Sequence, residues 1–163
     1  MTDTAPDPAR LLDLLLDTCA KAGADAVDAR LTRSTGVSVE VRGGALETTE
    51  RAEDQGVALR CFFGHRQAHV AGSDLSDEAL SDLAERCVAM ARAVPEDPYC
   101  GLATPEELAD PVYGPALDLD GDPEIPLDQL EADAVAAETA ALAVDGVRQI
   151  ASCGAGWTRT ERW

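Results

Sequence analysis

Apolar residues change their spacing near residue 26 of this 163-residue chain, and that change restricts the fold more than any other feature. Before it, Leu11, Leu15 and Cys19 recur every fourth residue, as on the buried face of a helix. Asp7 is a favourable N-cap and Gly23 a favourable terminating residue. We therefore expect one amphipathic helix between them.

After residue 26, apolar and polar residues alternate, which is typical of strands with one buried face. The alternating runs are residues 27–32, 37–42, 57–63 and 67–71. Thr35-Gly36, Gly43-Gly44 and Gly64-His65 are turn signals between them, whereas residues 46–53 are harder to assign. Short turns join antiparallel neighbours, so we predict an antiparallel three- to four-stranded meander.

A second helix is predicted from Ser76, a favourable N-cap, to the residue before Pro95, which ends it. Leu80 and Cys87 lie on its continuous apolar stripe. Two helices are then available for the apolar face of the meander, which makes the fold class α+β. We assign residues 1–94 to an N-terminal α+β domain.

The composition changes after residue 94, because seven of the nine prolines in the whole chain lie within residues 95–126. We interpret this segment as an acidic linker rich in Pro and Gly. An Ala-rich helix over residues 127–145 and a strand over residues 147–152 follow, so residues 127–163 look like the start of a second, truncated helix–strand unit. A lone helix and strand have little to pack on, and we expect them to be loosely ordered.

The chain carries 31 acidic and 13 basic residues, a formal net charge of −18. Its Lys and Arg residues are scattered, whereas nucleic acid and anionic membrane surfaces are bound by clusters of them, so both are excluded as direct partners. No apolar run approaches the ~20 residues of a spanning helix, and the N-terminus lacks the features of a secretory signal. We expect a cytoplasmic protein.

The acidic residues are concentrated in the second part of the chain, with 20 acids and 5 bases from Asp74 onward. Such asymmetry occurs in acidic interaction surfaces and DNA mimics, and also on solvated faces that keep a protein soluble. We favour the solvated face, because the acids are spread among helix and loop signals.

The five cysteines are Cys19, Cys61, Cys87, Cys100 and Cys153. They are odd in number and widely spaced, and no two form a Cys-x-x-Cys pair. This pattern favours reduced thiols that serve as small buried hydrophobes.

Two short motifs resemble known binding motifs, but each lacks a residue that the motif requires. His65 and His69 have the spacing of a zinc helix, but Arg66 follows where the catalytic Glu would stand, and a hairpin would keep the two imidazoles apart. Gly154-Ala155-Gly156 lacks the sixth-position Gly of a dinucleotide-binding loop, so we interpret it as a loop between strands.

Asp118, Asp120 and Asp122 alternate as in a calcium loop, but the Gly and Glu that such a loop requires are missing. The chain has only two His and no Gly-x-Ser-x-Gly elbow. We therefore assign no catalytic residue, no metal ligand and no cofactor to this chain.

One candidate contact surface remains, on the polar face of the meander. It comprises Arg30, Glu40, Arg42 and Arg60, and ordinary solvation of these side chains is the alternative. Individual binding residues stay unknown at this point.

Several segments resemble the TldD/PmbA family, whose members were first described as modulators of DNA gyrase. The similar segments are Gly23-Ala24-Asp25-Ala26-Val27, Ser34-Thr35-Gly36-Val37-Ser38-Val39, Gln55-Gly56-Val57-Ala58-Leu59-Arg60, Ser73-Asp74-Leu75-Ser76, and Pro95-Glu96-Asp97-Pro98-Tyr99-Cys100-Gly101-Leu102-Ala103. The last of them is similar to the PmbA branch, also called TldE. The resemblance extends over nearly the whole chain.

The resemblance implies a cytoplasmic zinc metallopeptidase made of a TldD and a PmbA subunit, acting on peptides and unfolded segments. In that family the TldD subunit carries a His-Glu-x-x-x-Asp-x-x-x-His helix that binds zinc, and PmbA subunits lack it. The resemblance makes this chain the N-terminal domain of a PmbA/TldE-like subunit, with a structural and assembly role. Its partners would be a TldD-like subunit, or a second copy of itself, and peptide substrates.

A different class of function stays open from the charge and from the older family description. The chain would then be a stand-alone acidic protein-binding module of the DNA-mimic type, directed at gyrase. Tight, salt-sensitive binding to gyrase distinguishes this alternative from the metallopeptidase subunit.

Overall fold

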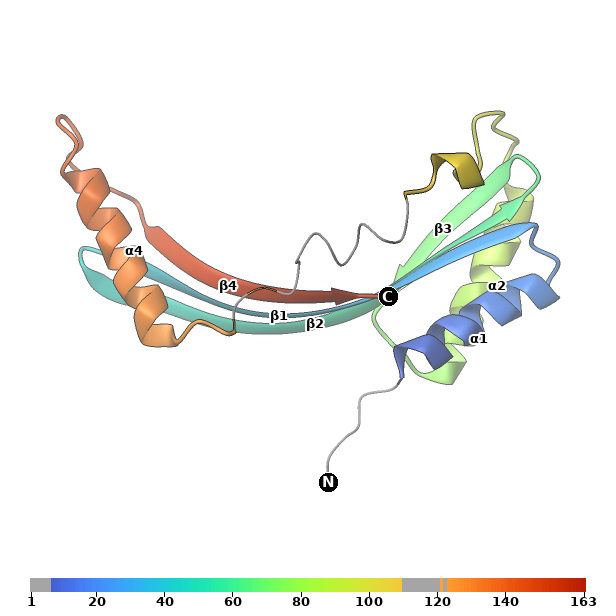
Figure 1. The fold of residues 1–163 in the computed structure, drawn as a ribbon, viewed down its shortest axis with the longest axis horizontal. Coiled ribbons are helices and arrows are strands. Elements are labelled where there is room, and N and C mark those ends of the chain that lie inside the picture. The colour runs from blue at the N-terminus through green and yellow to red at the C-terminus, as the bar shows by residue number, and fades with distance from the viewer. Residues whose placement is uncertain (1–6, 110–120, 122) are drawn as a thin grey trace, which may run out of the picture. The chain divides into compact units, whose positions relative to one another are not determined.

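The computed structural model describes residues 7–109, 121 and 123–163. Its elements in chain order are α1 (Pro8–Lys21), β1 (Ala26–Arg42), β2 (Ala45–Phe63), β3 (Arg66–Gly72), α2 (Asp77–Ala93), the short 3-10 helix η1 (Pro105–Glu107), α4 (Leu127–Leu142) and β4 (Cys153–Arg162) (Figure 1). The strands form one sheet in the order β3-β2-β1-β4. The predicted α+β class with an antiparallel sheet is confirmed.

The predicted turn at Thr35-Gly36 is wrong, because β1 continues through it as a single strand of 17 residues. Gly36 serves a close approach of strands instead: a Cβ there would lie 3.1 Å from the Thr158 hydroxyl oxygen in β4. Residues 46–53, which are hard to assign from the sequence, belong to β2. The turn at Gly43-Gly44 is confirmed, with φ angles of 61° and 76° that suit a two-residue hairpin.

The chain forms two compact units. Unit 1 comprises Met1–Arg33, Gln55–Tyr113 and Arg162–Trp163, and unit 2 comprises Ser34–Asp54 and Gly114–Glu161. Strands β1 and β2 contribute residues to both units. These units are spatial groupings, and the domain boundaries expected at residues 94 and 126 stay predictions.

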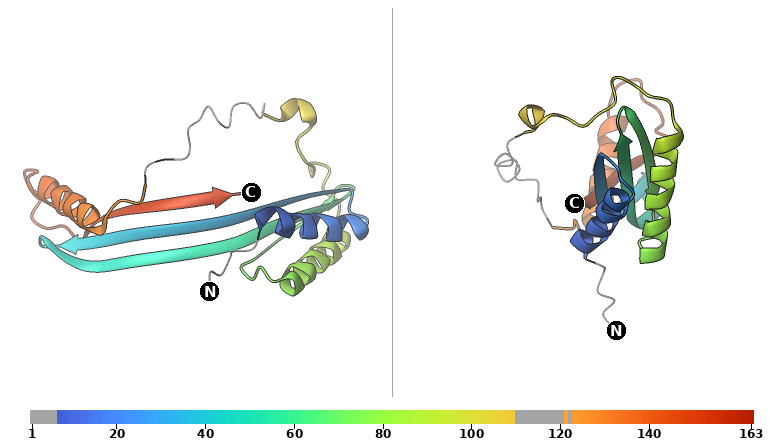
Figure 2. Two further views of the ribbon diagram at one scale, coloured as in Figure 1. Left: turned by 60° about the horizontal axis from the view of Figure 1, so that its bottom comes forward. Right: turned by 90° about the vertical axis from the view of Figure 1, so that its right-hand side faces the viewer.

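In unit 1, α1 and α2 pack on the same face of the sheet (Figure 2). The two predicted helices and their apolar stripes are confirmed. Leu11 and Leu15 of α1, Leu59 of β2 and Leu80 of α2 are all completely buried. Because full burial of a leucine side chain contributes about 2 kcal/mol, this layer pair provides the main stabilisation of unit 1.

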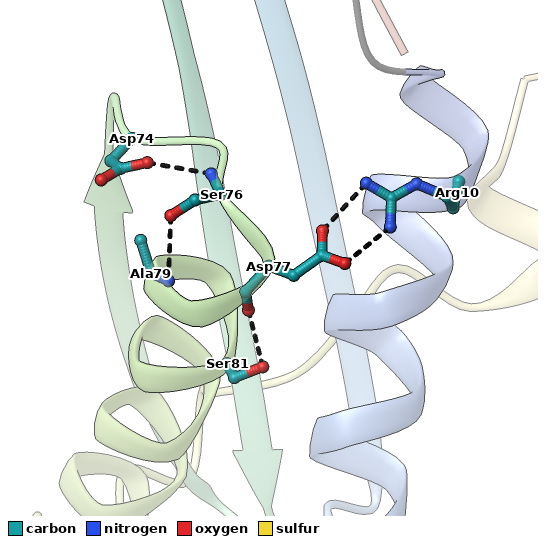
Figure 3. A network of polar contacts seen from close by, with 6 residues as sticks. All are labelled: Arg10, Asp74, Ser76, Asp77, Ala79 and Ser81. Carbon is teal, nitrogen blue, oxygen red and sulfur yellow. Dashed lines mark hydrogen bonds and ion pairs between the residues drawn. The ribbon is translucent and has the colours of Figure 1, made fainter.

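Polar contacts fix the starts of these two helices (Figure 3). The Ser76 hydroxyl oxygen accepts a hydrogen bond from the backbone N–H of Ala79, as its predicted N-cap role requires. The Arg10 guanidinium donates two hydrogen bonds of 2.9 Å to the Asp77 carboxylate, which joins the first turn of α1 to the first turn of α2. These bonds lower the pKa of Asp77.

In unit 2, α4 packs on apolar side chains of β1. Val39, Val41, Leu130 and Ala134 are nearly or fully buried in one cluster. The premise that residues 127–163 have little to pack on is therefore wrong, because β1 extends far enough to receive α4. The predicted strand at residues 147–152 is also wrong, and the strand lies at Cys153–Arg162 instead.

Candidate functional site

A polar groove lies on the sheet face of unit 1 opposite α1 and α2. Its volume is about 740 Å³. It is lined by Asp28, Ala29, Arg30, Ala58, Arg60, Gln67 and His69. Strands β1, β2 and β3 therefore all contribute to its floor.

Strand alternation explains why these polar side chains gather on one face. Leu59 and Cys61 point into the core, so Arg60 between them points outward. In the β2–β3 register Arg60 pairs with His69, which places both on the outer face. Gln67 lies two residues before His69 on the same strand and shares that face.

An ion pair organises the centre of the groove. The Arg60 Nε donates to the Asp28 carboxylate oxygens at 3.1 and 3.3 Å, and a second guanidinium nitrogen of Arg60 also donates to Asp28. The Arg60 guanidinium carbon lies 5.0 Å from the ring centre of Phe62, a cation–π arrangement. The hydrogen bonds to Asp28 raise the pKa of Arg60.

Arg30 gives the groove its excess positive charge. Its side chain is exposed, and no hydrogen bond or ion pair joins it to any described residue. Two guanidinium groups and one carboxylate give Arg30, Arg60 and Asp28 together a net charge of +1, on a chain whose net charge is −18. The groove can therefore hold a carboxylate or a peptide carbonyl through guanidinium donors.

Only half of the contact surface expected from the sequence comes together here. Arg30 and Arg60 line the groove. Glu40 and Arg42 belong to unit 2, where Arg42 Nε donates to the backbone oxygen of Ala151 at 2.9 Å. The groove of unit 1 therefore replaces the predicted four-residue surface, and it adds Asp28, Gln67 and His69 to Arg30 and Arg60. The same strand alternation predicts that these three side chains point outward, so the sequence contained the signal for them.

The two short motifs singled out in the sequence, His65/His69 and Gly154-Ala155-Gly156, lie in strands and a turn. His65 lies in the β2–β3 turn and His69 on β3, so the hairpin prediction is confirmed. The predicted loop at Gly154-Ala155-Gly156 is wrong, because these residues lie within β4, where a Cβ at Gly154 would lie 3.0 Å from the Val39 backbone oxygen. Close approach of β1 and β4 explains both glycines.

The other candidate ligands divide between the described residues and those outside them. All five cysteines are free thiols, and Cys19, Cys61 and Cys87 are buried as expected. Asp118, Asp120 and Asp122 lie outside the described residues. Within residues 7–109, 121 and 123–163, no group of three His, Cys, Asp or Glu side chains could hold a metal ion. None of the described helices has the length and hydropathy of a membrane span.

Sequence reasoning missed one buried carboxylate. Glu138 of α4 is only 4% exposed, and its two carboxylate oxygens accept hydrogen bonds from the backbone N–H groups of Gly43 and Gly44 at 2.8 and 2.7 Å. The signal available was a Gly-Gly turn with two backbone donors that require partners. Nothing in the sequence pairs that turn with a residue 95 positions away.

Comparison with known proteins identifies relatives of this chain. Residues 27–91 match the family model described as PmbA/TldA metallopeptidase domain 1. The chain is 31% identical over 121 residues to the metalloprotease PmbA of Escherichia coli O157:H7, covering 74% of this chain and 26% of that protein. The chain belongs to the PmbA/TldD family.

Another PmbA/TldD relative, the metalloprotease PmbA homolog of Haemophilus influenzae, is 31% identical over 125 residues, 77% of this chain and 27% of that protein. The chain spans about a quarter of the length of these curated relatives. The segment matched by the family model contains every residue that lines the groove.

Two solved structures share the fold of this chain. TldE from Thermococcus kodakarensis has a TM-score of 0.67 and 18% identity, over 93% of this chain and 34% of that one. A protein of Bacteroides thetaiotaomicron described as a candidate modulator of DNA gyrase also has a TM-score of 0.67, with 20% identity over 94% of this chain and 35% of that one. At these identities the likeness shows the fold alone.

Proposed function

We propose that this chain is the N-terminal portion of a PmbA-like subunit of a two-subunit cytoplasmic metallopeptidase that acts on peptides and unfolded segments. In this proposal a TldD-like partner holds the zinc ion, and the present chain serves assembly and shapes the access of peptides. The observation that carries it is the match of residues 27–91 to the first domain of the PmbA/TldA metallopeptidases.

The described residues do not fit a zinc centre, since they bring no three suitable ligands together. We therefore derive no hydrolytic step from this chain. Its own chemistry is that of recognition: Arg30 and Arg60 supply guanidinium donors, and Gln67 and His69 add polar side chains along one strand.

In this proposal the groove is the contact surface. Helices α1 and α2 cover the other face of the sheet in unit 1, so a peptide or a partner subunit can approach this part of the sheet from the groove side. A partner that offers a carboxylate to Arg30 gains a hydrogen-bonded ion pair without breaking the pair between Arg60 and Asp28.

Assembly is tested by co-expressing the 163-residue chain with a TldD-type subunit from the same genome and measuring binding by calorimetry. We expect a stable complex that the double substitution Arg30→Ser and His69→Ser weakens roughly tenfold or more, the effect of losing one or two interface contacts. Arg86→Ser is the matched control, because Arg86 is an exposed arginine on α2. Failure of the wild-type chain to bind would refute the assembly role.

Activity is tested with an unfolded peptide in the presence of zinc. We expect cleavage when both chains are present and none with this chain alone. Zinc-dependent cleavage by the purified chain alone would contradict the proposal.

A second proposal is direct binding of gyrase by an acidic module. It rests on the net charge of −18 and on the description given to the Bacteroides protein. Salt-sensitive binding to purified gyrase supports it, and no binding at low ionic strength rejects it.

A further inference from the structure

Three cysteine side chains meet in the core of unit 1, each from a different element. Cys19 lies in α1, Cys61 in β2 and Cys87 in α2, and all three are completely buried. The Cys61 thiol donates to the Cys19 sulfur at an Sγ–Sγ distance of 3.1 Å. A disulfide bond is about 2.05 Å long, so the two sulfurs need roughly 1 Å of further approach to bond.

Cys87 is engaged differently, although it belongs to the same cluster. Its thiol is directed at backbone oxygens, with the Ala68 oxygen at 3.4 Å and the Leu59 oxygen at 3.8 Å. The three thiols do not form a metal site, because no group of three such ligands among the described residues could hold an ion. Cys61 therefore lies beside both other thiols, and the Sγ–Sγ contact of 3.1 Å is the one to Cys19, whereas the Cys87 thiol is also held by backbone oxygens.

We propose that Cys19 and Cys61 are a modification site, where reaction with a small-molecule disulfide produces an intramolecular disulfide that fastens α1 to β2. One protein thiolate attacks a sulfur of the reagent and releases one reagent thiol. The second protein thiolate then attacks the protein sulfur of the mixed disulfide and releases the other. The protein loses two electrons and two protons, and the reagent is reduced to two thiols.

Burial makes this reaction conditional on local opening. Neither sulfur is accessible, and burial raises the pKa of both Cys19 and Cys61, so the attacking thiolate is scarce in the closed state. Lifting of α1 from the sheet exposes both thiols to the reagent. Its return places the second thiol beside the mixed disulfide. The rate of bond formation is therefore expected to follow the opening of α1.

The experiment treats the full 163-residue chain with hydroxyethyl disulfide at several urea concentrations below the unfolding transition. After alkylation of the remaining thiols, proteolysis and mass spectrometry identify the bonded cysteines. We expect a peptide joining Cys19 to Cys61, formed faster as urea rises. Since the bond joins two cysteines 42 positions apart, the oxidised protein should unfold at least about 5 °C higher than the reduced one.

Matched variants separate the pair from the rest of the cluster. Cys19→Ala and Cys61→Ala are expected to abolish the cross-link, and Cys87→Ala, which removes an equally buried thiol, to leave it intact. The wild-type peptide map gives the same answer without any variant, should one fail to fold. A bond between Cys61 and Cys87, or reaction confined to Cys100 and Cys153, would overturn the proposal. So would an oxidised protein with unchanged thermal stability.

Discussion

Replacing Glu138 by glutamine tests how unit 2 holds its hairpin turn. The carboxylate accepts one hydrogen bond from each of the Gly43 and Gly44 N–H groups, and it is almost completely buried. Glutamine keeps the shape of the side chain. It offers only one acceptor oxygen, however, and it turns an NH₂ group toward the second backbone donor.

The magnitude follows from the two bonds. A hydrogen bond to a charged group contributes about 1.5–3 kcal/mol, and a neutral one about half of that. Glu138→Gln loses one bond and reduces the other to a neutral one, so the expected loss is about 3 kcal/mol. Because Glu138 is buried, solvent screening does not reduce this figure appreciably. A loss of that size corresponds to roughly a 100-fold change in a local opening equilibrium.

Two measurements check this value. Amide hydrogen exchange at Gly43 and Gly44 reports the local opening, and urea unfolding followed by circular dichroism reports stability. Glu131→Gln is the matched control, because it removes the same charge from the same helix, at a half-buried side chain with no hydrogen bond or ion pair to the described residues. If Glu138→Gln changes exchange and stability no more than Glu131→Gln does, the reasoning is refuted.

Three further predictions concern packing and pH. Gly154→Ala should destabilise the protein by about 1–3 kcal/mol in urea unfolding, because its Cβ would lie 3.0 Å from a β1 backbone oxygen, whereas Gly101→Ala, with open space around it, should not. Leu130→Ala should cost about 3 kcal/mol by the same assay if α4 is packed on β1, and a loss below about 1 kcal/mol would contradict that packing. The hydrogen bonds from Arg10 lower the pKa of Asp77. The Asp77–Arg10 pair therefore stabilises the folded state above pH ~4, and this stabilisation is lost as the pH falls through the lowered pKa. Asp77→Asn should therefore flatten the decline of stability below about pH 4, and an unchanged decline in acid titration would reject this assignment.

The local signals were sufficient for the elements of unit 1. The spacing of Leu11, Leu15 and Cys19 and the cap at Ser76 give α1 and α2, because helix period and capping depend on residues within a few turns. The hairpins at Gly43-Gly44 and Gly64-His65 follow from turn chemistry for the same reason. The outward position of Arg30 and Arg60 follows from alternation alone.

Partners remote in sequence decided the rest. Thr35-Gly36 has the composition of a turn, yet β1 stays extended there, because it is hydrogen-bonded to β4, which comes close enough to favour a small residue. The positions of Gly154 and Gly156 within β4 have the same cause. No local pattern carries this information, since the approach of β1 to β4 brings together residues more than a hundred positions apart, such as Gly36 and Thr158.

The sequence by itself therefore determined the α+β class, the two helices of unit 1 and, through its resemblance, the family. Only the tertiary structure decided which polar residues share the groove and which thiols meet in the core. It also showed that Glu138 holds the Gly43-Gly44 turn. The physical reason is that period and capping are local properties of the chain, whereas a groove, a sulfur contact and a buried carboxylate each need residues that only folding brings together.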